Sequence, residues 1–143
     1  MKAIILNLLF VIVWTIVGHY CGVFSLFFSS LVYPTLFIFS AQYLEQNFSR
    51  LFFIPFCFFV LLISDYLFRI FGGGIHDDAG KGLCEINFYL TMSTSILAMF
   101  FVAFKLSINN GIVNKQQWFY NNLLVVFSAI ETYVVFMKYI VKI

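Results

Sequence analysis

From Ala3 to Tyr43 the chain carries no charged residue when histidine is counted as neutral. A helix of about 20 apolar residues spans a bilayer core of roughly 30 Å, so this run holds either two spans or one long, broken span. The whole chain has the same character, because 63% of its residues are hydrophobic and only 10% are charged. Soluble domains carry about 25% charged residues. The sequence therefore predicts an integral membrane protein.

The backbone of a membrane-spanning segment has no water to bond with, so the apolar segments are expected to be helical. We expect a single transmembrane domain over residues 1–143, with boundaries that are uncertain by about three residues. The apolar segments are 3–19, 24–44, 48–70, 83–106 and 118–140. The fold class is therefore all-α.

The number of spans depends on the first two segments, which only "HYCGV" separates. Pro34 or the Ser29-Ser30 pair could also break the second segment. Five spans would divide the basic residues four against four, whereas four spans would divide them five against three. Because basic residues favour the cytoplasmic side, this count favours four helices, with both termini and the loop 71–82 in the cytoplasm. A bundle of five helices is the alternative.

A glycine-rich polar loop, residues 71–82, lies in the stretch "FRIFGGGIHDDAGKGLC". Its glycines can adopt positive φ and expose backbone N–H groups. We expect the loop to be a docking or signalling surface for a cytoplasmic protein partner, and Asp65 to pair with Arg69 at its start, because an acid four residues before a base suits a helix. The docking residues are Arg69, Gly72, Gly73, Gly74, His76, Asp77, Asp78 and Lys81. A second polar loop, 107–117, reads as an ordinary connection with an Asn-Gly turn.

Several chemistries do not fit this loop. A phosphate-binding loop needs four residues between Gly74 and the Gly80-Lys81 pair, but five are present, and Gly82 replaces the Ser or Thr that binds magnesium. No zinc module has this spacing, and three cysteines do not make a disulfide framework. The net charge of +2 is too small for direct nucleic-acid binding. We therefore expect no metal and no cofactor.

The segment "RIFGGGIHDDAGKGLC" resembles the AgrB family of membrane-embedded cysteine endopeptidases, which process quorum-sensing peptide precursors. In that family a basic residue and Gly-x-His lead to a catalytic cysteine at the start of the next span. The resemblance maps Arg69, Gly74, His76 and Cys84 to that pattern. It implies that Cys84 is the nucleophile and His76 the base. The interval between them is one residue longer here, so a peptidase is the alternative function.

The overall plan, a short, phenylalanine-rich polytopic chain without an enzymatic domain, is similar to membrane subunits of bacterial antiphage defence systems such as Kiwa. This similarity implies a multi-pass protein of the bacterial inner membrane that forms homo-oligomers and anchors or signals to a cytoplasmic partner. This non-enzymatic role is the leading hypothesis.

Glu131 lies near the middle of the last segment, in "VFSAIETYVVF". A carboxylate there costs several kcal/mol unless it is protonated, paired or hydrated, and the next basic residue on that helix is Lys138. We expect Glu131 to be neutral and hydrogen-bonded at a helix or subunit interface. Its possible partners are Asn87, Ser93, Thr94, Ser95 and Ser128. A small ion channel carried by Glu131 is the third hypothesis.

Overall fold

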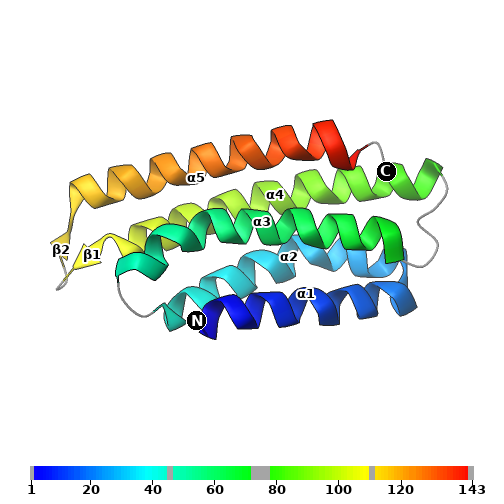
Figure 1. Ribbon diagram of the computed structural model, residues 1–143, viewed down its shortest axis with the longest axis horizontal. Helices are drawn as coiled ribbons and strands as arrows, with labels where there is room; N and C mark the ends of the chain where they lie inside the picture. The colour runs from blue at the N-terminus through cyan, green and yellow to red at the C-terminus, as the bar shows by residue number, and fades with distance from the viewer. Residues whose placement is uncertain (1, 45–46, 72–77, 110–111, 142–143) are drawn as a thin grey trace.

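The computed structural model describes residues 2–44, 47–71, 78–109 and 112–141, and these form a helical bundle (Figure 1). Each of the five helices is long and apolar enough to cross a membrane. The all-α prediction is confirmed, and the number of helices is five, not the favoured four. The helices are α1 (Lys2–Cys21), α2 (Val23–Ser40), α3 (Asn47–Phe71), α4 (Asp78–Leu106) and α5 (Lys115–Val135).

Successive helices run in opposite directions along the bundle, so α2 and α4 point the same way and α5 points the opposite way (Figure 1). With five helices the two ends of the chain lie at opposite ends of the bundle. The arrangement that placed both termini on one side is therefore not the one that the chain adopts. With five spans the basic residues divide four against four, so their distribution favours neither orientation.

The turn between α1 and α2 consists of Gly22 alone, which has a φ of 55°. Its N–H donates to the Gly18 carbonyl at 2.8 Å, and its own carbonyl accepts from the Ser25 hydroxyl at 2.7 Å. This backbone conformation is one that glycine adopts without a steric penalty. Because the turn is so short, α1 continues through Cys21 and reaches 20 residues, enough for a complete span.

Pro34 lies within α2 and does not break it. Proline has no N–H, so the carbonyl of Ser30, four residues earlier, loses its partner in the helix. The Thr94 hydroxyl on α4 donates to this carbonyl at 2.8 Å. A neighbouring helix thus satisfies the freed backbone group, as membrane proteins require, and α2 continues to Ser40, where a 3-10 turn (Ala41–Tyr43) follows.

Helix α4 begins at Asp78, five residues before the predicted start at Leu83. A negative charge in the first turn suits the positive end of the helix dipole, and Leu83 and Cys84 pack against Leu26 and Phe68. Residues 78–82 of the predicted glycine-rich loop are therefore helical. The glycines in this turn had predicted a loop.

The second predicted loop, 107–117, is largely ordered into a small hairpin. Strands β1 (Ile108–Asn109) and β2 (Ile112–Val113) pair antiparallel, and the expected Asn-Gly turn at 110–111 lies outside the described residues. Asn114 then caps α5, its side chain accepting from the Gln117 N–H at 3.2 Å. After Val135 the helix ends in a π-helical turn, Phe136–Ile140.

Helix α3 is the centre of the bundle, since 61% of its span is buried, compared with 17% for α1. It packs against α1, α4 and α5, while α2 packs mainly against α4. At Gly18 the helices α1 and α3 come so close that an added Cβ would lie 2.3 Å from the Phe68 ring. The part of α3 that carries Asp65, Phe68 and Arg69 is therefore tightly enclosed.

Candidate functional site

The pair that the spacing predicted between Asp65 and Arg69 is present and buried. The Arg69 Nε donates to Asp65 Oδ2 at 2.7 Å, and the two side chains are 2% and 6% exposed. The guanidinium also lies over the Phe136 ring of the C-terminal turn, 5.4 Å from its centroid. Its Nη1 and Nη2 atoms are buried and make no hydrogen bond with any residue that the structure describes. The pair thus joins α3 to the end of α5.

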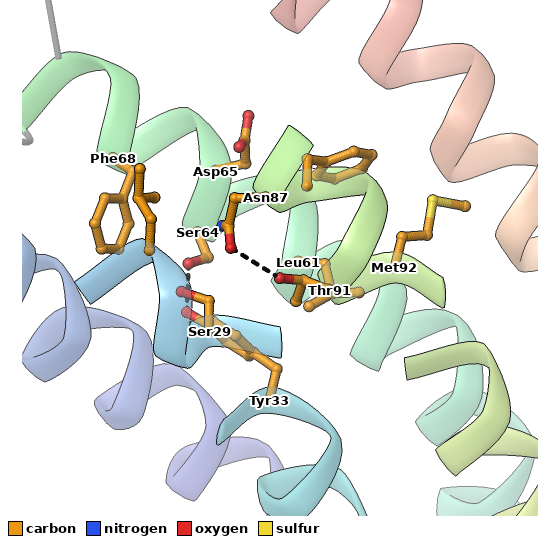
Figure 2. Close-up of a pocket in the computed structure, with 11 residues that line it drawn as sticks. Ser29, Tyr33, Leu61, Ser64, Asp65, Phe68, Asn87, Thr91 and Met92 are labelled. Atoms are coloured by element: carbon orange, nitrogen blue, oxygen red, sulfur yellow. Dashed lines mark hydrogen bonds between the residues drawn. The ribbon is translucent and has the colours of Figure 1, made fainter. Parts of the chain in front are cut away.

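Beside Asp65, a small cavity lies between α2, α3 and α4 (Figure 2). Its volume is about 20 Å³, which is room for about one water molecule. The Tyr33 hydroxyl bonds the Ser64 hydroxyl on one side, and the Thr91 hydroxyl donates to Asn87 Oδ1 at 3.5 Å on the other. The cavity is lined by Leu26, Ser29, Tyr33, Leu61, Ser64, Asp65, Phe68, Asn87, Phe88, Thr91 and Met92.

The polar groups of this cavity extend towards α1 but not through the bundle. Trp14 Nε1 donates to the Ser29 hydroxyl at 3.1 Å, which in turn donates to the Ser25 carbonyl at 3.2 Å. Beyond Tyr33 the side chain of Phe37 packs at a centroid distance of 6.0 Å. Phe37 belongs to a buried apolar cluster that also contains Phe53, Ile54, Met99 and Val102. The site is therefore a small polar pocket that apolar packing bounds on the Phe37 side.

Most of the predicted docking residues lie outside the described part of the chain. These are Gly72, Gly73, Gly74, His76 and Asp77. Asp78 is the first residue of α4, and Lys81 in its first turn is half-buried. The α3 flank of the loop is held twice, because Arg69 bonds Asp65 and the His19 Nδ1 bonds the Phe71 carbonyl at 2.9 Å. The contact from His19, which the sequence did not suggest, ties α1 to the end of α3.

Cys84 is fully buried on α4, where it packs with Leu26 and Phe68. A cysteine nucleophile must be reached by both its base and its substrate. His76, the base that the peptidase resemblance implies, lies outside the described residues. In this conformation the thiol serves as part of the apolar packing beside the Asp65–Arg69 pair.

Glu131 occupies a different setting, on the exposed surface of α5. It makes no hydrogen bond or ion pair with any residue that the structure describes. The expected partners are engaged elsewhere or do not reach it: Thr94 bonds Ser30, and Ser128, three residues earlier on α5, is buried and makes no bond with Glu131. The neighbouring side chains on its own helix, Ile130 and Val134, are exposed and apolar. Among the described residues of a single copy, this carboxyl group therefore has no partner.

Sequence reasoning missed the hydroxyl groups of the cavity, above all Tyr33 and Ser64. Both lie in continuous apolar runs, and only the fold brings them together, through the hydrogen bond between α2 and α3.

Comparison with known proteins adds no relatives, because no family model, no curated protein and no solved structure matches the chain.

Proposed function

We propose that the chain is a multi-pass subunit of the bacterial inner membrane that assembles with copies of itself through α5. The same subunit holds a cytoplasmic protein at the end of the bundle that carries the glycine-rich loop. The observation that supports self-assembly is the position of Glu131, exposed on an apolar helix with no partner in the part of its own chain that the structure describes.

Self-assembly has an energetic reason, because in a single copy the Glu131 carboxyl group would face lipid. A carboxyl group turned towards lipid costs several kcal/mol, and such residues normally face protein or water. Burying it against a second copy, where it forms hydrogen bonds, removes most of this cost. Association therefore becomes favourable even though apolar contacts between membrane helices supply little driving force.

The side chains around Glu131 form a stripe suited to helix packing. Its members recur at intervals of three and four residues, the spacing of a helix-packing seam. All of them are exposed in the single chain, and we call this stripe the α5 seam. It consists of Tyr120, Leu123, Phe127, Glu131, Val134 and Lys138.

The docking role rests on how the loop is anchored. His19 holds Phe71 and Asp65 holds Arg69, so the chain enters the loop from a fixed position. The loop contains charged and glycine residues suited to contact with a soluble protein. The test is co-purification of proteins encoded by neighbouring genes with a tagged chain. Lys81→Glu with Asp78→Lys should abolish capture, and Lys105→Glu at the opposite end should not.

We extend the proposal to phage defence, on the architectural similarity to membrane subunits of antiphage systems. The test is plaque formation on cells that carry the gene with its neighbours or lack it. Protection that disappears with Glu131→Leu and persists with Glu131→Gln would support the role. Equal plaque numbers with and without the gene would contradict it.

Self-assembly is tested by co-expressing two copies that carry different tags. Capturing one tag should recover the other copy. Glu131→Gln, which keeps a hydrogen-bonding group, should retain this recovery, whereas Glu131→Leu should lose most of it. As a matched control, Ile12→Leu on the exposed face of α1 should behave like the unchanged protein. Failure to recover the second copy of the unchanged chain would contradict the proposal.

A further inference from the structure

Besides the α5 seam, the surface has an apolar groove between α2 and α4. The groove has a volume of about 50 Å³. Its walls are Leu26, Phe27 and Ser30 of α2 and Leu83, Ile86 and Leu90 of α4, and Asn87 also lines it. Leu26 and Asn87 line the polar cavity too, so the groove lies next to the candidate site. The groove and the α5 seam are carried by different helices (Figure 1).

Copies related by an axis along the membrane normal keep every residue at the same depth. Glu131 can therefore reach only those groups of a neighbour that lie at its own level. Phe136 stacks on Phe88 with ring centroids 3.7 Å apart, which places the two helices in register. Glu131 lies five residues before Phe136, about 7.5 Å deeper at 1.5 Å per residue. Because α4 runs in the opposite direction, the matching residue on α4 is Ser93.

The depth of Ser30 on α2 follows from the bond that the Thr94 hydroxyl donates to its carbonyl. Ser30 therefore lies at the same depth as Thr94. Thr94 follows Ser93 directly, so Ser30 and Ser93 differ in depth by about one residue. Ser93 is exposed, and Ser30 is a wall of the groove. Two hydroxyl groups of the α2–α4 face thus share the depth of Glu131. The apolar neighbours match as well, because Val134 has the depth of Leu90.

We infer that the α5 seam of one copy packs into the α2–α4 groove of the next copy, with the Glu131 carboxyl group against the hydroxyls of Ser30 and Ser93. This inference rests on the proposed self-assembly and specifies its geometry. The two contacting surfaces are different parts of the chain, so the contact is heterologous, and copies whose rotation about the membrane normal closes form a ring. Each copy thereby covers its neighbour's groove and the Asn87 side of the polar cavity.

A lipid chain in the groove would leave Glu131 without a partner, and a seam-to-seam dimer would leave the groove uncovered by protein. The heterologous contact avoids both outcomes. The Ser93 and Ser30 hydroxyls donate to the Tyr89 and Phe27 carbonyls at 2.8 and 3.4 Å, so their oxygens are acceptors for the O–H of a neutral Glu131 carboxyl group. The heterologous contact also fills an apolar groove with the apolar side chains of the seam.

Cysteine cross-linking in native membranes tests this geometry with Glu131 left intact. The exposed Cys21 is first changed to Ser, while the buried Cys57 and Cys84 are kept. Phe27→Cys in the groove and Val134→Cys in the seam are then combined. Mild oxidation should give a ladder of covalent dimers, trimers and larger species. Phe27→Cys with Tyr133→Cys, the adjacent exposed residue that points to another side of α5, is the matched control and should give none.

The single variants distinguish failure of this inference from failure of self-assembly. If Val134→Cys alone gives dimers and the double variant adds no higher species, the copies meet seam to seam and the inference is overturned while self-assembly stands. If no variant cross-links although the copies co-purify, the inference is likewise overturned. If the copies neither cross-link nor co-purify, both proposals fail.

Ser30→Ala with Ser93→Ala should weaken association about threefold to tenfold, and no change would contradict the assigned partners.

Discussion

Asp65 and Glu131 are both carboxylic acids within apolar helices, and the bundle surrounds them in opposite ways. Asp65 is buried on the central helix and bonds Arg69 at 2.7 Å. Glu131 lies exposed on the outer helix, with no partner among the described residues. Since an unpaired carboxyl group in the membrane costs several kcal/mol, the first is satisfied within the chain and the second requires another molecule. Asp65 therefore has its partner inside the bundle, whereas we propose that Glu131 finds its partner on another copy.

The largest expected effect comes from removing one half of the buried pair. Arg69→Met leaves Asp65 buried without a partner, so we expect a loss of about 3–5 kcal/mol in the free energy of unfolding. Denaturant titration in mixed micelles measures this. Lys105→Met, an exposed residue at the opposite end of α4, is the control and should change stability by less than about 0.5 kcal/mol.

A second variant separates the charge from the packing. Asp65→Asn combined with Arg69→Met removes both charges and should recover much of the stability lost in Arg69→Met. If the double variant is as unstable as the single one, the unpaired charge is not the cause, and the contrast between Asp65 and Glu131 loses its basis.

A smaller effect is expected from the close packing beside the pair. Gly18→Ala places a Cβ 2.3 Å from the Phe68 ring, so α1 and α3 must separate. We expect a loss of about 1–3 kcal/mol, as for other overpacked cores. Gly82→Ala is the matched control because its added Cβ meets no atom within 4 Å. It should stabilise α4 by up to about 1 kcal/mol through helix propensity. Equal effects at both glycines would show that this end of the bundle is loosely packed.

The next effect concerns the carbonyl that Pro34 frees. Thr94→Val removes its donor, and we expect a loss of about 0.6–1.7 kcal/mol, the range of hydrogen bonds between membrane helices. Pro34→Ala restores the helical N–H to the Ser30 carbonyl, so Thr94→Val should be nearly neutral in that background. A double-mutant cycle of unfolding measurements checks this. Additive effects of the two changes would contradict the bond between α2 and α4.

The smallest expected effect concerns Cys84. Its thiol is buried beside the Asp65–Arg69 pair, where it contributes apolar packing. Cys84→Ala should therefore lower stability by only about 1 kcal/mol and leave assembly and partner capture intact. The peptidase alternative predicts instead that processing of a peptide substrate is lost in this variant. Loss of function with normal folding and assembly would establish the alternative.

The sequence located the helices well because a lipid-spanning helix has to be long and apolar. The predicted pair of Asp65 and Arg69 is also confirmed, since its spacing along one helix is local information. Of the two helix counts that the sequence left open, the structure has five, for two physical reasons. A single glycine, Gly22, makes the first turn, and Thr94 on a distant helix compensates for Pro34.

The candidate site could not be derived in the same way. Lipid-facing and buried faces of a membrane helix are both apolar, so periodicity does not distinguish the buried Asp65 from the exposed Glu131. The contact between Tyr33 and Ser64 joins residues 31 positions apart and depends on how the fold places α2 and α3. Glu131 was recognised as unusual from its position alone, but only the fold shows that the described residues of its own chain offer no partner.

The central claim is that Glu131 is satisfied by another copy of the chain. The most direct test is native mass spectrometry of the protein released from detergent micelles, compared with its Glu131→Leu variant. The account predicts a species whose mass is a multiple of 16.6 kDa for the unchanged chain and a shift towards the monomer for the variant. A monomer of the unchanged chain, with the same unfolding stability in both forms, would contradict it.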